Sequence, residues 1–180
     1  LQPSLLIFFI SVTFGGIATF LPLYTAEKGV SGIQWYFLLY AMALMVTRLF
    51  SGRLYDRRGH RAIFVPSTVL IMIGMLLLAW MPSEAVLYIA AVLYGFGFGS
   101  VQPALQAWSI EKTAPNRKAM ANATYFSFFD LGVGIGAIVF GQIGYLFGYR
   151  SIYITAAVSI FISIIVYIWI VRSEGKLKIV

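Results

Sequence analysis

The stretch "GRLYDRRGHRAIFV", residues 52–65, concentrates arginines between two runs that are almost free of charge. A second stretch, "GQIGYLFGYRSIYI", residues 141–154, keeps the glycines, one Arg and the apolar tail at the same spacing. A constant offset pairs four identical residues: Gly52 with Gly141, Gly59 with Gly148, Arg61 with Arg150, and Ile63 with Ile152. The match indicates that the chain contains two related units.

Composition places the chain in a membrane. Its 180 residues are 61% hydrophobic and only 11% charged, and its mean hydropathy is +0.89. Soluble domains carry about 25% charged residues. The net charge of +7 would fit nucleic-acid binding in a soluble protein, but here the basic residues lie between apolar runs, where they set membrane topology. We therefore expect an integral membrane protein whose surroundings are the lipid bilayer, with no nucleic-acid partner.

Apolar runs of about 20 residues are long enough to cross a bilayer as helices. The sequence predicts an all-α membrane fold with six such spans. They are Ser4 to Ala26, Gly32 to Tyr55, Ala62 to Met81, Ala85 to Ile110, Arg117 to Phe147, and Ser151 to Val171. Because the chain starts at Leu1, almost within a span, we expect it to be part of a longer protein.

Lys and Arg residues are distributed unevenly between the two predicted membrane faces. One face holds only Lys28 and Arg150. The other holds Arg53, Arg57, Arg58, Arg61, Lys112, Arg117, Lys118, Arg172, Lys176 and Lys178. Since cytoplasmic loops are enriched in Lys and Arg, we expect this basic face and both termini to be cytoplasmic, in the plasma membrane.

The two matched stretches join the second span to the third and the fifth to the sixth. Three spans separate them, so they lie on opposite membrane faces. This is the pattern of a three-plus-three inverted repeat, a design found in transporters. We predict one domain, residues 1–180, made of repeats at about 1–83 and 84–180. The alternative is a chance likeness between two Gly-rich membrane turns.

Asp56 is not explained by topology, because a carboxylate in the last turn of a helix opposes the helix dipole. Neighbouring arginines can compensate it locally. Alternatively, Asp56 faces the start of the fifth span near Arg117 on the same membrane face, in a contact that forms in only one conformation. Gly52, one turn earlier, would allow a neighbouring helix to approach closely.

The loop resembles the signature loop of the major facilitator superfamily, found between the second and third helices of each six-helix half. The residues that carry the resemblance are Gly52, Leu54, Asp56, Arg57, Gly59 and Arg61. It implies a twelve-helix secondary transporter whose halves rock around a central cavity, with these residues forming a conformational gate. This chain would be one half, and its partner would be the missing N-terminal half or a second copy.

The run from Asp130 to Gly136 is similar to the eleventh helix of bacterial drug and metabolite exporters, which implies the C-terminal half. A Gly-Pro pair is usual in the fifth helix of the N-terminal half of drug:proton antiporters. Here Gly136-Ala137 stands in its place. This departure supports the C-terminal assignment or weakens the antiporter interpretation.

Polar residues within the spans suggest which helices face a cavity. The third and sixth spans are the least polar and are expected to face lipid. The predicted substrate cavity is lined by Tyr40, Tyr94, Gln102, Gln106, Asn122 and Tyr125. Alternatively, the glutamines only bond between helices, and Arg48 either pairs or reaches toward the headgroups. The glycines of the fourth span are predicted to be packing surfaces.

Asp130 is the only acidic residue deep in a span, about 20 Å along the helix from Arg117. Ionising a carboxylate in hydrocarbon is costly, so it must be protonated, paired or hydrated. We expect it to couple proton or substrate movement. The alternative is a structural hydrogen bond, because its stripe of small residues, which includes Gly134, Ala137 and Gly141, favours tight packing.

These features predict secondary active transport of a small molecule. Proton-coupled efflux of a lipophilic drug or metabolite is the leading expectation, with the proton gradient in place of any cofactor. The alternatives are a sugar or metabolite symporter, a six-helix channel, and a self-associating membrane protein. An enzyme is not expected, since the only His, His60, lies in a loop and no phosphate-binding loop or metal-binding helix motif is present.

Overall fold

A computed structural model describes the backbone of residues 1–177 and the side chains of residues 1–173. Within this range the chain is almost entirely helical and contains no strand. The elements are α1 (Gln2–Lys28), α2 (Ile33–Ala79), α3 (Glu84–Glu111), the short 3-10 helix η1 (Pro115–Arg117), α4 (Lys118–Phe147) and α5 (Tyr149–Leu177). Each of the five long helices is long and apolar enough to cross a membrane.

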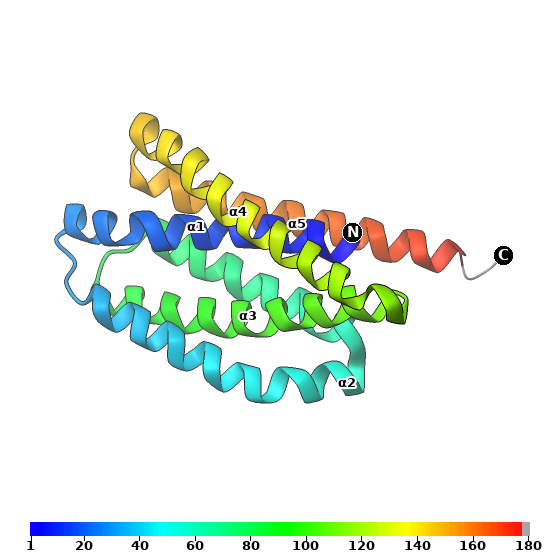
Figure 1. The fold of residues 1–180 in the computed structure, drawn as a ribbon. Helices are drawn as coiled ribbons and strands as arrows, with labels where there is room; N and C mark the ends of the chain where they lie inside the picture. The colour runs from blue at the N-terminus through cyan, green and yellow to red at the C-terminus, as the bar shows by residue number, and fades with distance from the viewer. Residues whose placement is uncertain (178–180) are drawn as a thin grey trace.

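Helix α2 contains two spans. At Gly59 the backbone is not helical (φ 67°, ψ −178°), and the chain turns back on itself there (Figure 1). The first arm covers residues 33–58 and the second arm residues 60–79. This conformation is essentially restricted to glycine, so a single residue reverses the chain. The second and third predicted spans are therefore two helices that run in opposite directions and meet at Gly59 without an intervening loop.

The matched turn at Gly148, between α4 and α5, has nearly the same backbone (φ 80°, ψ 162°). The residues after it also match those after Gly59. Ile63 and Ile152 are both buried, at 2% and 0% exposure, whereas Val65 and Ile154 are both exposed, at 40% and 38%. Two turns on opposite faces thus share one backbone conformation and one burial pattern, which supports our proposal of an inverted repeat.

Glycines allow the helices of the bundle to approach closely. A Cβ on Gly95 would lie 2.7 Å from the carbonyl oxygen of Tyr40 in the first arm of α2, and one on Gly97 would lie 2.5 Å from that of Ser67 in the second arm. The glycines of the fourth span are packing surfaces, as predicted. They seat α3 between the two arms of α2.

Helix α4 packs through a different face from the one expected. A Cβ on Gly136 would lie 2.5 Å from the carbonyl oxygen of Val12 in α1, and one on Gly132 equally close to that of Phe8. By contrast, no atom lies within 4 Å of a Cβ placed on Gly134. The prediction that this stripe packs tightly was wrong for Asp130 and Gly134, because Gly132 and Gly136 make the close contact there. Further along the stripe, Ala137 and Gly141 do lie against Gly15 and Phe20 of α1.

Within residues 1–173, several helices carry large apolar side chains that are exposed. The exposed side chains of α5 fit the predicted lipid-facing role of the sixth span. The third span was also expected to face lipid, but this span, the second arm of α2, buries one whole face against the rest of the bundle. The first arm of α2 and helix α4 are just as exposed. The exposed residues include Met42, Met45, Leu49, Leu131, Ile135, Ile138, Phe161 and Trp169.

We predict that Gly136→Ala destabilises the protein and that Gly134→Ala does not. The added methyl group at position 136 must push α1 and α4 apart, which costs about 1–3 kcal/mol. At position 134 it enters open space and removes the entropic cost of a helical glycine. Thermal unfolding of the whole protein in detergent measures both variants. Equal losses in the two would contradict this packing.

Candidate functional site

A set of hydrogen bonds, here called the polar ladder, links the first arm of α2, α3 and α4. The Arg48 Nη2 atom donates to Gln102 Oε1 at 2.6 Å. One turn further along α3, Gln106 Nε2 donates to Asn122 Oδ1 in α4 at 2.8 Å. Tyr125 of α4 donates its hydroxyl to the backbone oxygen of Gln102 at 2.6 Å. Three helices are thus joined at one level by groups that would otherwise be unsatisfied in the bilayer.

The ladder resolves two alternatives that the sequence leaves open. Both glutamines bond between helices, and Arg48 is paired rather than merely extended toward the headgroups. Each of the two side-chain amides still has one group that makes no hydrogen bond. Among the described residues, the Gln102 amide nitrogen and the Gln106 carbonyl oxygen have no hydrogen-bond partner. These groups remain available to a solute.

An aromatic cluster lies next to the ladder. The Tyr94 hydroxyl is 3.0 Å from Thr13 Oγ1 of α1, and the Tyr40 and Tyr94 rings are 5.6 Å apart. Phe98 of α3 stacks on Tyr94 and contacts Phe129 of α4. Both Tyr94 and Tyr125 are fully buried, so in this conformation they support the site from behind, while Tyr40 is half-buried at its edge.

Asp130 is exposed and has no hydrogen-bond or ion-pair partner among the described residues. The structural hydrogen bond considered as its alternative role is therefore not formed. The side of α4 on which Asp130 lies follows from the contacts of the two residues before it. Phe128 shares a hollow with Val166 of α5, and Phe129 contacts α3. Because each residue turns a helix by about 100°, Asp130 lies beyond the α3 side of α4, away from α5.

Arg48 and Asp130 lie at similar depths. Arg48 is ten residues from the end of the first arm, or about 15 Å, and Asp130 is twelve residues from the start of α4, or about 18 Å. Both ends belong to the basic face. The chain therefore places one basic and one acidic side chain at similar distances from this end of the bundle, on helices that flank α3.

The predicted gate loop is exposed at the basic end. Asp56 has no partner among the described residues, and it lines a hollow of about 680 Å³ together with Glu111 and Lys118. Lys118 begins α4, so Asp56 faces the element proposed as its distant partner without touching it. Leu54, Arg57 and Arg61 are exposed as well. No described atom lies within 4 Å of a Cβ placed on Gly52. The close helix approach predicted at Gly52 is therefore not present in this conformation.

Two contacts of the gate loop were not predicted from the sequence. Tyr55 donates its hydroxyl to Glu111 Oε2 at 2.6 Å and ties the loop to the end of α3. His60 stacks on Trp108 at 3.9 Å between ring centroids and lies 3.2 Å from the Tyr167 hydroxyl of α5. The sequence gives only a weak indication of these contacts, namely that polar residues end the second and fourth spans on the same predicted membrane face. Spacing alone does not say which of them meet.

Among the described residues, no three His, Cys, Asp or Glu side chains gather closely enough to hold a metal ion. The arrangement offers instead an amide ladder, an aromatic wall and one isolated carboxylate. Such groups bind and orient small solutes or protons.

Comparison with known proteins agrees with this arrangement. A sequence profile of the Major Facilitator Superfamily matches residues 4–179. The chain belongs to the Major Facilitator Superfamily. Two relatives are an uncharacterized MFS-type transporter of Burkholderia mallei (strain SAVP1) and another of Pseudomonas aeruginosa (strain LESB58). Each is 29% identical over 149 residues, which are 83% of this chain and 37% of the relative.

Solved structures show the same fold. A mutant of the peptide transporter POT in complex with alafosfalin superposes with a TM-score of 0.76 at 22% identity, over 93% of this chain and 37% of that chain. The human organic anion transporter TETRAN gives 0.77 at 23% identity, over 92% and 39%. The chain thus spans less than two-fifths of these proteins. The predicted family and all-α membrane fold are confirmed, and membership of a transporter family supports a non-enzymatic role.

We predict a measurable coupling between Gln106 and Asn122. Removing either amide leaves the other unsatisfied, so the double variant Gln106→Ala/Asn122→Ala should be less destabilised than the sum of the two single variants. Hydrogen bonds between membrane helices give coupling energies of about 0.6 kcal/mol. Unfolding in mixed micelles measures the cycle. The pair Gln106→Ala and Gln142→Ala is the control, because Gln142 is exposed elsewhere on α4. Additivity in the first cycle would contradict the ladder.

Proposed function

We propose that this chain is a six-helix half of a secondary active transporter that moves a small molecule by alternating access. The observation that carries the proposal is Asp130, an acidic residue at membrane depth that is exposed and unpartnered among the described residues. A lipid-facing carboxylate at that depth is strongly unfavourable. Its side of α4 therefore faces a wet cavity or a partner, and Asn122 of the polar ladder lies about two turns earlier on the same helix.

A partner is needed to enclose such a cavity. The first arm of α2 and helix α4 flank α3 and expose apolar side chains along their length. We propose that an N-terminal six-helix half covers this side, with a second copy of the chain as the alternative. Substrate would bind between the two parts, against Tyr40, Gln102, Gln106 and Asn122, with Tyr94 and Tyr125 behind them.

Proton-coupled efflux of a lipophilic drug or metabolite is our leading assignment. The aromatic cluster suits a flat apolar solute, and Asp130 suits either a proton or a cation. The basic end of the bundle would face the cytoplasm, as the charge distribution predicts, in the plasma membrane. Asp56, Arg57 and Arg61 would latch the cytoplasmic gate when it is closed.

A sugar or metabolite symporter is the second candidate. It is favoured by the unpartnered amide groups of Gln102 and Gln106, which match the hydroxyl groups of such solutes. A six-helix channel has less support, because all five long helices can span the membrane and no short re-entrant segment lies within residues 1–177.

We predict that Asp130→Asn abolishes gradient-driven transport. The whole protein would be reconstituted in liposomes with an imposed pH gradient, and ethidium movement followed by fluorescence. Loss of the ionisable group should reduce the initial rate at least tenfold, since the asparagine cannot exchange a proton. The control is Glu27→Gln, which removes an exposed acid at the opposite end of the bundle and should keep the rate within about twofold.

Ethidium movement that survives in Asp130→Asn would leave Asp130 without a coupling role. Absence of movement in both wild type and variant would remove the lipophilic-cation assignment, and sugars would be tested next with the same variants. A substrate moved down its own gradient by the variant, but not driven by pH, would separate coupling from binding.

We predict that Asp56→Asn cuts transport at least fivefold while expression and thermal stability stay near wild type. In the present conformation Asp56 makes no contact that stabilises the fold, so only a contact formed in another conformation would be lost. Initial transport rates and melting curves of the same preparation are compared. Wild-type turnover in this variant would rule out the latch.

A further inference from the structure

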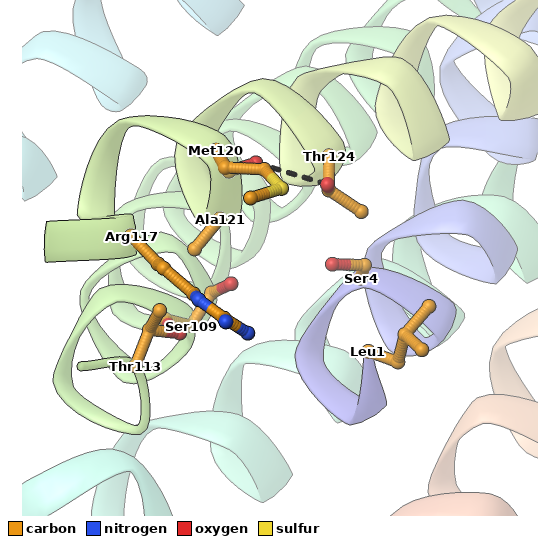
Figure 2. Close-up of a pocket in the computed structure, with 8 residues that line it drawn as sticks. All are labelled: Leu1, Ser4, Ser109, Thr113, Arg117, Met120, Ala121 and Thr124. Atoms are coloured by element: carbon orange, nitrogen blue, oxygen red, sulfur yellow. Dashed lines mark hydrogen bonds between the residues drawn. The ribbon is translucent and has the colours of Figure 1, made fainter.

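A second hollow lies at the basic end, away from the polar ladder. Its volume is about 330 Å³, and it lies between the start of α1, the end of α3 and the start of α4. Figure 2 shows its lining: Leu1, Ser4, Ser109, Thr113, Arg117, Met120, Ala121 and Thr124. Thr124, the lining residue nearest to Asp130 in sequence, lies six residues or about 9 Å before it on α4 and is turned by about 120° from it, so this hollow faces away from the proposed transport cavity.

Two polar groups point into the hollow without a protein partner. The guanidinium of Arg117 extends across it (Figure 2) and makes no hydrogen bond or ion pair with any described residue. The Ser4 side chain is 1% exposed, and its hydroxyl, which faces the same space, has no hydrogen-bond partner. A buried hydroxyl without a protein partner is unusual, because such groups are nearly always satisfied by protein or by ordered water.

The two threonine hydroxyls of the hollow are already committed as donors. Thr113 donates to the Ser109 carbonyl oxygen at 2.8 Å and Thr124 to that of Met120 at 2.9 Å. Arg117, Ser4 and the Ser109 hydroxyl remain as donors, and Arg117 and Ser4 come from opposite walls. A group that accepts from both would join the start of α1 to the start of α4.

The electrostatics of the hollow favour an anion. None of its lining residues is acidic. Helix α4 begins beside it with neither a side-chain cap nor an acidic residue in its first turn, so the positive end of its dipole is uncompensated. Lys118 adds a further positive charge to the same turn.

We propose that this hollow binds a phosphate group that is attached to a neutral or apolar remainder. The planar guanidinium of Arg117 presents paired N–H donors that match two phosphate oxygens, and the Ser4 hydroxyl donates to a third. Leu1, Met120 and Ala121 provide an apolar wall for the remainder. The group belongs either to the headgroup of an anionic lipid or to a soluble phosphate ester, since both carry the same chemistry.

The test uses the whole protein in an uncharged detergent. Intrinsic fluorescence follows thermal unfolding during titration with dioctanoyl phosphatidylglycerol, with dioctanoyl phosphatidylcholine as the lipid control and glycerol phosphate as the soluble probe. We expect the phosphatidylglycerol or the glycerol phosphate to raise the melting temperature in a saturable manner. Arg117→Gln should weaken the apparent affinity at least tenfold and Ser4→Ala about threefold.

Matched variants separate the site from general charge effects. Arg172→Gln removes an exposed basic residue at the same end of the bundle and should keep the affinity within about twofold. Arg117→Lys keeps the charge without the paired donors and should give an intermediate loss. Ala121→Leu fills the hollow without changing any charge and keeps the proposal testable if Arg117→Gln fails to fold.

The outcomes distinguish the sources. Saturation by phosphatidylglycerol alone assigns the site to a lipid headgroup, and saturation by glycerol phosphate assigns it to a soluble ester. Binding that is unchanged in Arg117→Gln and Ala121→Leu, equal binding of phosphatidylcholine, or no binding of either phosphate probe would overturn the proposal. None of these results depends on transport, so a failure here is distinct from a failure of the proposed function.

Discussion

The whole architecture depends on the cost of leaving a polar group unpaired in hydrocarbon. Each unsatisfied backbone N–H or C=O costs several kcal/mol in the bilayer, so every crossing segment must be a continuous helix. The chain reverses only where this cost disappears, at the two ends of the bundle. Gly59 and Gly148 make two of these reversals with the same backbone conformation. The same cost favours the pairing of Arg48 with Gln102 and of Gln106 with Asn122, because these side chains come from helices that apolar contacts alone would pack less specifically.

Glycine then decides which helices form pairs. Gly95, Gly97 and Gly99 seat α3 between the arms of α2, and Gly132 and Gly136 seat α4 on α1. These close approaches leave α4 attached to the bundle along one face only. Its opposite side carries Asp130 and Gly134, which no described residue of the chain covers. The position of the charged residue is thus a consequence of which glycines pack, and not of the charge itself.

Much of this fold follows from the sequence, because hydrophobic length and the distribution of Lys and Arg are one-dimensional properties. The six spans and the reversal near Gly59 are of this kind. The packing face of α4 is not. Gly132, Gly134 and Gly136 are equivalent by composition, and the choice between the two faces depends on where Phe8 and Val12 lie in α1. For the same reason the ladder partners were named individually but not as pairs, and the Tyr55–Glu111 and His60–Trp108 contacts were missed. Each joins segments whose relative rotation only the three-dimensional packing determines.

The separation of Arg48 from Asp130 is informative about how the site works. Opposite charges at similar depth in a low-dielectric medium attract strongly, yet Arg48 bonds to a neutral amide and Asp130 bonds to no described residue. Helix α3, with its ladder, stands between them and holds Arg48 through Gln102. A direct pair would occupy both side chains. Arg48 instead bonds to Gln102, and the Asp130 oxygens have no hydrogen-bond partner among the described residues. The ladder therefore does two things, since it joins three helices and gives Arg48 a partner other than Asp130.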